Sequence, residues 1–388
     1  PISLSLNTFI SLGIKKSIRI GFSYIFSSFF PIRNEKTLED FLINRFGKEL
    51  YKTFFKDYTE KVWGKSCKEI PSSWGKQRIK GVSISKVLTQ AFIKNNSLKQ
   101  KNIETSLINK FLYPRLGPGQ LWEEVARIVV EKGGEIHLNS KVTELYSSKK
   151  ILQKVVSTNT KSGETNEFKG DYFFSTMPVK ELINNMIPKP QDNLVQIANN
   201  LEYRDFITVG LLLKKLKLKK KKENSPISDN WIYIQEKSVK LGRIQIFNNW
   251  SPDMIEDKNN TWLGLEYFCN EGDELWEMSE NEFSQFAIDE LASINIIDKK
   301  DVVDFTVIKM PKTYPAYFGS YNQFGVLQNY TDAIENLFLI GRNGMHKYNN
   351  QDHSMLTAIQ AVENIINDVK SKENIWAINT EDDYHEEK

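Results

Sequence analysis

The sequence is poor in side chains that bind metals or form disulfides. Its 388 residues include two cysteines, Cys67 and Cys269, and four histidines. The cysteines lie far apart, and no Cys-x-x-Cys pair or Cys/His cluster occurs. Neither a zinc site nor a disulfide framework is indicated. We therefore expect no metal, and a reducing compartment, the cytoplasm, fits this composition best.

Long apolar runs and strong charge are also missing. No apolar run reaches the roughly 18 residues of a transmembrane helix. The net charge of +3 is too mild to indicate a nucleic-acid partner, because such proteins carry a clustered basic excess. The stretch from Ile2 to Phe30 is apolar and serine-rich, and Lys15, Lys16 and Arg19 interrupt it. An interfacial membrane helix is one interpretation of this stretch, but we favour a helix packed within the protein.

The motifs of several enzyme classes do not occur. We find no Gly-x-Ser-x-Gly, no Walker loop and no His-Glu-x-x-His, which argues against common hydrolases, P-loop nucleotidases and zinc proteases. The dinucleotide-binding pattern Gly-x-Gly-x-x-Gly is absent as well.

The most informative stretch of the sequence runs from Asn336 to Val369. It opens with a short apolar run, Asn336–Ile340, that Gly341 ends, and this predicts a buried strand. A polar loop, Arg342–His353, leads to a helix that Asp352 or Ser354 can cap. The start of a helix presents unpaired N–H groups and a partial positive charge, which suits a phosphate or an electron-rich ring.

Periodicity predicts further elements on both sides of a lysine run at 214–222. Helices are expected from Thr37, which can act as a cap, to Ile84, and at 121–130 and 280–294. Alternating or β-branched stretches predict strands. They are at 136–145, 155–157, 167–168, 171–178, 203–213, 231–235, 243–250, 262–268 and 302–310.

Several of these segments resemble one family. The sequence GRNGMHKYNNQDHSM is similar to the C-terminal flavin-contacting segment of the FAD-dependent amine oxidase and protoporphyrinogen oxidase superfamily, in particular its UDP-galactopyranose mutase-like branch. Gly341, Arg342, Gly344, Tyr348 and Asp352 match that branch. His346, Asn350 and Gln351 depart from it, so the flavin side of the resemblance is better supported than the sugar-nucleotide side. The phrases FFKDYTEKVWG, YPRLGPG and STMP follow in the family's order.

The resemblance implies a mixed α/β (α+β) fold: a Rossmann-like FAD-binding domain and a substrate domain of antiparallel sheet and helices. We expect residues 1–110 to be the helical part of the substrate domain and 111–200 the return segment of the FAD domain. Residues 201–310 would form the substrate-domain sheet, 311–372 the C-terminal strand, loop and helix, and 373–388 an acidic tail. The βαβ unit that holds the pyrophosphate in this family is not found, so we expect an N-terminally incomplete sequence that binds FAD weakly or not at all.

The resemblance also implies the site. The cofactor is expected to be FAD, and its expected contacts are Val142, Ser175, Thr176, Gly341, Arg342, Asp352, His353, Ser354 and Met355. Arg342 would add positive charge near the flavin. The catalytic residues stay unknown, with Tyr348, His346 and Tyr314 as candidates, and Tyr317 in the same KTYPAY segment.

Three functions remain open. The favoured one is an FAD-dependent oxidoreductase that oxidises an unknown small molecule by hydride transfer. The first alternative is a mutase-like isomerase of nucleotide sugars, and the second is a non-enzymatic truncated remnant. Beyond a small-molecule substrate the sequence names no partner and no oligomeric state.

Overall fold

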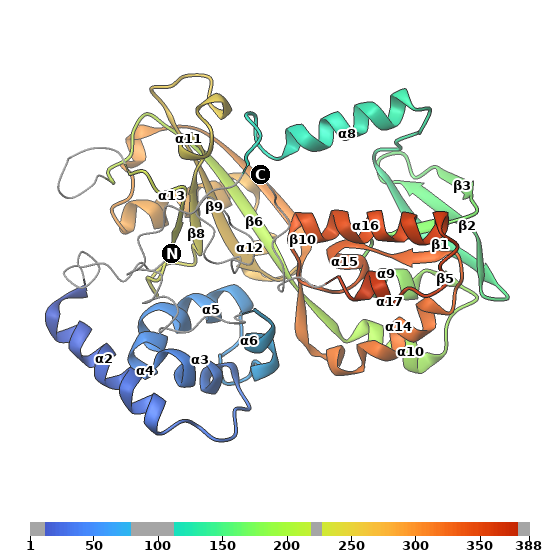
Figure 1. The fold of residues 1–388 in the computed structure, drawn as a ribbon. Coiled ribbons are helices and arrows are strands. Elements are labelled where there is room, and N and C mark those ends of the chain that lie inside the picture. Colours follow the sequence, from blue (N-terminus) through green and yellow to red (C-terminus); the bar gives the residue numbers. More distant parts are fainter. Residues whose placement is uncertain (1–11, 79–111, 219–226, 379–388) are drawn as a thin grey trace. The chain divides into compact units, whose positions relative to one another are not determined.

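The computed structural model describes residues 12–78, 112–218 and 227–378. The chain forms two compact units (Figure 1). Unit 1 comprises Pro1–Val125, Arg204–Pro311 and Glu386–Lys388. Unit 2 comprises Ala126–Tyr203 and Lys312–His385. Among the described residues, no helix is both long and apolar enough to cross a membrane.

Residues 12–78 of unit 1 form a group of helices. They are α2 (Ile14–Phe29), α3 (Leu38–Phe46), α4 (Lys48–Leu50), the π-helix η1 (Tyr51–Phe55), α5 (Lys56–Trp63) and α6 (Ser72–Arg78). The predicted cap at Thr37 is confirmed, since its side chain accepts from the Asp40 N–H in a capping box. The helices predicted from Thr37 onward are confirmed as far as Arg78, and Gly47 and Gly64, with positive φ angles of 79° and 64°, divide them. Residues 79–84 of that prediction lie outside the described residues.

The sheet of unit 1 has the strand order β10-β6-β9-β8-β7. Its strands are β6 (Leu201–Leu213), β7 (Trp231–Tyr233), β8 (Arg243–Ile246), β9 (Thr261–Cys269) and β10 (Val302–Gly319). The pairs β6–β9, β9–β8 and β8–β7 are antiparallel, as the sequence predicted for this part of the chain. One strand prediction needs correction: Phe247–Trp250 forms the short helix α11, followed by the 3₁₀ turn η3 (Pro252–Met254).

A helix covers one face of this sheet. The short α12 (Glu274–Glu277) precedes α13 (Glu280–Ser293), and the 3₁₀ turn η4 (Lys299–Asp301) leads to β10. Phe283, Ala287 and Leu291 of α13 are fully buried, as predicted, whereas Phe286 is half-buried at the margin of the same cluster. They pack with alternate residues of β6, β8 and β9, among them Ile207, Val209, Ile244, Leu263 and Leu265. Burial of these aliphatic side chains is the main stabilising contribution in unit 1. Cys67 and Cys269 are buried and free.

Unit 2 contains two small sheets with helices around them. The first has the order β3-β2-β1-β5, built from β1 (Ser140–Ser148), β2 (Ile151–Asn159), β3 (Thr165–Lys169) and β5 (Met186–Ile187). The predicted hairpin around Ser162-Gly163 is confirmed as β2–β3. Ile136 and Leu138 were predicted to begin the first strand, but β1 starts only at Ser140, and both side chains are exposed.

The second sheet of unit 2 is the parallel pair β4 (Phe173–Ser175) and β11 (Leu337–Leu339). Around the two sheets lie α8 (Gly119–Glu131), which spans both units, α9 (Val179–Asn184), α10 (Asp192–Asn199), the 3₁₀ turn η5 (Ser320–Gln323), α14 (Phe324–Asp332), α15 (Gly341–Gly344), α16 (Gln351–Ile366) and α17 (Glu373–Trp376). The predicted helix at 121–130 is thus confirmed.

The C-terminal stretch follows the predicted order of strand, loop and helix with two differences. The N-cap of α16 is Asn350, not Asp352 or Ser354, which lie within the helix, and Asn350 makes no side-chain capping bond. Ile375 and Trp376 of α17 are buried in the core of unit 2, inside the stretch assigned to an acidic tail. The rest of that tail, from Asn379, lies outside the described residues.

Candidate active site

The carboxyl ends of the parallel strands β4 and β11 carry small residues. Ser175 pairs with Leu339, and the Ile340 N–H donates to the Ser175 carbonyl at 3.0 Å. Thr176 follows Ser175 directly, and Gly341 follows Ile340. Ligands of open parallel α/β sheets bind outside the carboxyl ends of the strands. We therefore expect a binding site at this edge of unit 2.

A cavity of about 360 Å³ opens at this edge, within the usual volume range of ligand pockets. It brings together three residues that the sequence predicted to contact the cofactor, Val142 from β1 and Ser175 and Thr176 from the end of β4. Most other lining side chains are apolar: Leu145, Leu152, Val155, Phe173, Phe174, Met177 and Leu337. The Ser175 hydroxyl is buried and has no hydrogen-bond partner within the described parts of the chain, so it is available to a ligand.

Two glycines hold the turn α15 against the end of β4. A Cβ atom on Gly344 would lie 2.3 Å from the Ser175 carbonyl oxygen, far closer than any real contact. Gly341 takes a φ angle of +70°, which favours glycine, and a Cβ there would reach Thr176 at 3.7 Å. Glycine at both positions lets the backbone of α15 lie directly on β4.

Hydrogen bonds tie the start of α16 to this turn. The Gly341 N–H donates to the Thr357 hydroxyl at 3.0 Å, and the Ser354 hydroxyl donates to the Asn349 side-chain oxygen at 3.0 Å. Asn350 supplies no side-chain cap, and the Asp352 carboxylate in the first turn of α16 accepts hydrogen bonds from the Asp352 and His353 N–H groups instead.

His353, which is buried, contacts Asp352 through its Nδ1 atom at 3.0 Å. Burial acts to raise the pKa of Asp352, but hydrogen bonding and charge from His353 outweigh it, and the pKa is lowered. Asp352 is therefore a carboxylate at neutral pH. Met355, the last predicted contact, is exposed on the outer face of α16.

Arg342 carries a positive charge that no carboxylate in the described ranges neutralises. Its Nε and Nη2 atoms donate to the Asn349 carbonyl, and Nη1 donates to the Thr313 carbonyl at 3.2 Å. The guanidinium lies 4.8 Å from the Tyr348 ring centre and 5.4 Å from that of Tyr314. Carbonyl oxygens and aromatic rings orient the group without cancelling its charge.

Three tyrosines surround this arginine. The Tyr314 and Tyr348 rings stack at 5.4 Å with 15° between their planes. The Tyr348 N–H donates to the Tyr317 hydroxyl at 2.8 Å, which fixes the loop before α16. Two of the three catalytic candidates, Tyr348 and Tyr314, thus form one cluster with Arg342.

The third candidate, His346, lies elsewhere. It is fully buried, and its ring contacts those of Tyr203, Tyr321 and Phe324. Nε2 donates to the Ala316 carbonyl at 3.1 Å, and Nδ1 makes no hydrogen bond with any residue that the structure describes. Burial lowers the pKa of His346 to about 4, against the smaller opposing effect of the Ala316 carbonyl. A neutral, enclosed imidazole of this kind fits a structural role better than proton exchange with a substrate.

His346 should make the protein sensitive to acid. Its folded pKa of about 4 lies below the usual value of 6.5, so the unfolded chain takes up a proton first as the pH falls. The stability is complete above pH ~6.5 and declines towards pH ~4, by about 3 kcal/mol in total. His346→Asn, which tolerates the positive φ of 47° at this position, should flatten the dependence of Tm on pH in this window. Replacement of the exposed His137 by asparagine serves as the control, and an equal flattening there would contradict this assignment.

Sequence patterns missed several partners of these residues. Thr313 and Asn349 hold Arg342 through main-chain carbonyls, which no side-chain pattern reports. Thr357 bonds to Gly341 across 16 residues, and nothing in its helical surroundings marks it as different.

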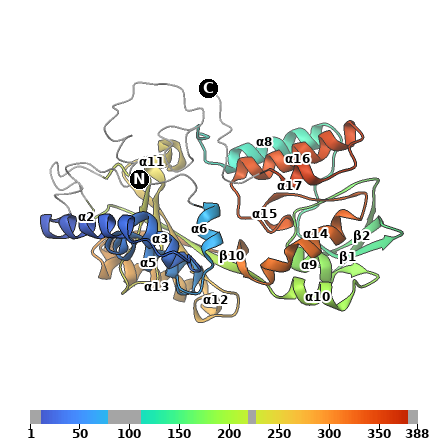
Figure 2. The ribbon, with the colours of Figure 1, turned by 60° about the horizontal axis from the view of Figure 1, so that its bottom comes forward.

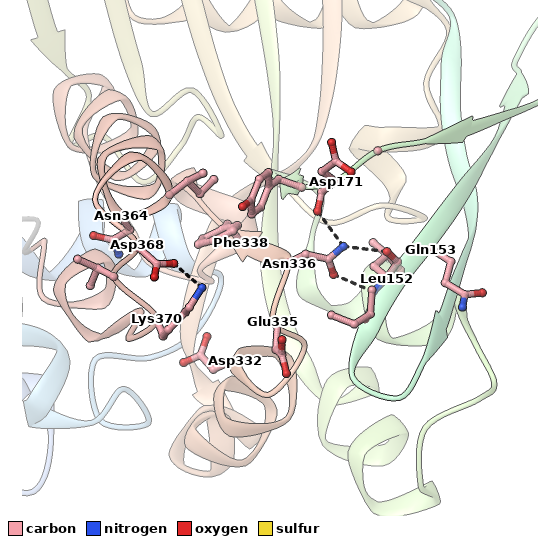
Figure 3. A pocket seen from close by; sticks show the side chains of 15 residues that line it. Leu152, Gln153, Asp171, Asp332, Glu335, Asn336, Phe338, Asn364, Asp368 and Lys370 are labelled. Carbon is pink, nitrogen blue, oxygen red and sulfur yellow. Dashed lines mark hydrogen bonds and ion pairs between the residues drawn. The ribbon is translucent and has the colours of Figure 1, made fainter.

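A larger cavity, of about 1,100 Å³, lies at the amino ends of β4 and β11 (Figure 3). Asn336 bridges Leu152 and Asp171 there through three hydrogen bonds, and Lys370 pairs with Asp368. The carboxylates of Asp171, Asp332, Glu335 and Asp368 outnumber Lys370 on its lining. Negative charge would repel a phosphate. We therefore assign the candidate site to the smaller cavity and the adjoining loop.

Comparison with known proteins identifies the family of the chain. The family described as flavin containing amine oxidoreductase matches residues 32–366. The chain belongs to this family. The superfamily predicted from the sequence is thereby confirmed, and a flavin is the cofactor that family membership implies.

Solved structures agree on the fold. A reduced UDP-galactopyranose mutase superposes with a TM-score of 0.74 at 17% identity, over 95% of this chain and 77% of that one. A protein provisionally assigned as a protoporphyrinogen oxidase from Exiguobacterium sp. 255-15 gives 0.62 at 12% identity, over 92% and 75% of the two chains. An oxidoreductase from Methanosarcina mazei gives 0.50 at 10% identity, over 88% and 70%. At these identities the likeness shows the fold alone, and it confirms the predicted mixed α/β class.

The residues present fit a flavin. The unpartnered Ser175 hydroxyl offers a polar contact at the cavity, and the glycines of α15 let the backbone approach closely. Arg342, which no carboxylate neutralises among the described residues, adds positive charge, which suits the electron-rich end of a flavin or its phosphates.

Proposed function

We propose that the chain is an FAD-dependent oxidoreductase that oxidises a small molecule by hydride transfer from a carbon–nitrogen or carbon–carbon bond. Flavin supplies the hydride-accepting chemistry, and oxygen or another acceptor then takes up the electrons. The observation that carries the proposal is the unneutralised Arg342 on the loop between β11 and α16, in a chain of the flavin-containing amine oxidoreductase family. The cytoplasmic location stays a prediction.

In this proposal each group of residues has one task. Val142, Ser175, Thr176 and Gly341 would hold the cofactor at the carboxyl ends of β4 and β11. Arg342 would attract the negative charge that develops when a hydride is accepted. Tyr314 and Tyr348, stacked beside Arg342, would contact the substrate and orient it.

A mutase-like isomerase is the second candidate. The pairing of Arg342 with two tyrosines supports it, because a cation flanked by hydroxyl groups also suits the phosphates of a nucleotide sugar. An isomerase needs a reductant to become active but consumes none during turnover.

Anaerobic incubation with substrates separates these functions. The full chain, supplied with FAD, is mixed with amines, with unsaturated ring compounds or with UDP-galactopyranose. An oxidoreductase loses its visible flavin absorbance when a substrate is added without reductant. Conversion of UDP-galactopyranose only after chemical reduction, with no further reductant consumed, would favour the isomerase. If neither occurs with any compound although FAD binds, the proposal of an enzyme loses its support.

A further inference from the structure

The helix α2 packs against unit 1 through its small and polar face. Ser27 is its one buried residue, and the Ser23 hydroxyl accepts from the Glu49 N–H at 3.1 Å. Gly47 lies so close that a Cβ there would come within 2.8 Å of the Tyr24 backbone. Arg19 pairs with Glu49 at 3.3 Å. These contacts fix α2 along α3 and α4, at the outer edge of the helical group (Figures 1 and 2).

Most of the large apolar side chains of α2 are exposed, and only Ile20 and Tyr24 are half-buried on the packed face. The exposed side chains recur at steps of three and four residues, so they form one stripe along the helix. The stripe consists of Ile14, Ile18, Phe22, Ile25 and Phe29, and Phe26, Phe30 and Ile32 extend it. Phe22 is 70% exposed and Phe29 is 76% exposed. The helix thus packs against the protein, as expected, but leaves this apolar stripe exposed.

Charge and length indicate what covers the stripe. Lys15, Lys16 and Arg19 are exposed on α2, which contains no acidic residue. An anionic lipid surface would attract these positive charges, whereas a second copy of the helix would offer the same charges and no acidic partner. The 16 residues span about 24 Å, less than the ~30 Å hydrocarbon core, so the helix can lie on a bilayer but not cross it.

We propose that α2 attaches the protein to an anionic phospholipid surface. The helix lies in the plane of the interface, its isoleucine and phenylalanine stripe enters the boundary of headgroups and acyl chains, and the exposed Lys15 and Lys16 contact lipid phosphates. This attachment does not depend on the proposed redox function, since it uses residues of unit 1 outside the candidate site.

Sedimentation with vesicles tests the proposal. The full chain is mixed with vesicles of phosphatidylcholine alone or with roughly 30% phosphatidylglycerol. The double variant Phe22→Ser/Phe29→Ser should lower the partition coefficient on the anionic vesicles by about tenfold or more, and added salt should weaken binding of the unchanged chain. Val303→Ser/Ile308→Ser, which removes side chains of 51% and 49% exposure from β10, should bind like the unchanged chain. Circular dichroism checks that all three proteins are folded.

Several results would overturn the proposal. The unchanged chain could fail to sediment with anionic vesicles, or it could bind both vesicle types equally. The Phe22→Ser/Phe29→Ser variant could also bind anionic vesicles as well as the unchanged chain does. Sedimentation velocity tests whether a second copy of the chain covers the stripe instead. A dimer that dissociates only in the Phe22→Ser/Phe29→Ser variant, without lipid binding, would assign the stripe to that second copy.

Discussion

Replacing Gly344 with alanine should destabilise the protein by more than about 3 kcal/mol, because the added carbon has no room. It would lie 2.3 Å from the Ser175 carbonyl oxygen and 3.3 Å from the Thr176 Cα, and both are backbone atoms that cannot rotate away. Relief of this clash would separate α15 from β4 and disrupt the Ile340–Ser175 hydrogen bond. Thermal unfolding followed by circular dichroism measures the loss.

Gly325→Ala is the matched control. Gly325 lies in α14 with no atom within 4 Å of an added Cβ, and alanine has the higher helix propensity. Its Tm should stay equal or rise slightly. A Tm of Gly344→Ala within about 2 °C of the unchanged chain would show that α15 does not rest on the end of β4.

Replacing Arg342 with methionine should weaken FAD binding about tenfold or more. Methionine keeps much of the apolar stem but removes the charge that no carboxylate neutralises. A tenfold change corresponds to about 1.4 kcal/mol, a usual magnitude for one well-placed charge. Arg342→Lys should give an intermediate affinity, since an ammonium keeps the charge but cannot bond the Asn349 and Thr313 carbonyls in the same forked geometry. Quenching of flavin fluorescence measures the affinities.

Arg127→Met provides the control for net charge. Arg127 lies on α8, pairs with Glu131 on the surface and does not line the candidate cavity, so its loss changes the net charge by the same amount without removing a residue of the candidate site. Its FAD affinity should match that of the unchanged chain. If Arg127→Met and Arg342→Met weaken binding equally, the effect is one of overall charge and Arg342 has no special position.

The sequence predicted most elements because their periodicity is strong. The helix α13 and the hairpin β2–β3 are examples, and the burial of Phe283 and Leu291 follows from spacing alone. Periodicity shows which residues share a face, but not which way the face points. For that reason the sequence predicted a packed helix at α2 but did not show that it packs through Ser23 and Ser27 and leaves its apolar stripe exposed.

The candidate site could be predicted only in part. Glycines and polar residues after a short strand indicated the turn and the helix of 336–369, and the family resemblance added Val142, Ser175 and Thr176. The environment of Arg342 could not be predicted, since its partners are main-chain carbonyls of residues 313 and 349. Nor does the sequence distinguish the buried His346 from the loop residues beside it, because its burial depends on rings from three other segments.

Hydrogen–deuterium exchange of the full chain with and without FAD tests the central claim most directly. We expect FAD to slow exchange in residues 175–177 and 341–357, which form the carboxyl end of β4, the turn after β11 and the start of α16. The acidic cavity at the opposite ends of these strands, including residues 332–336 and 364–370, should exchange at an unchanged rate. Protection confined to that acidic cavity, or no protection at saturating FAD, would contradict the assignment of the flavin site.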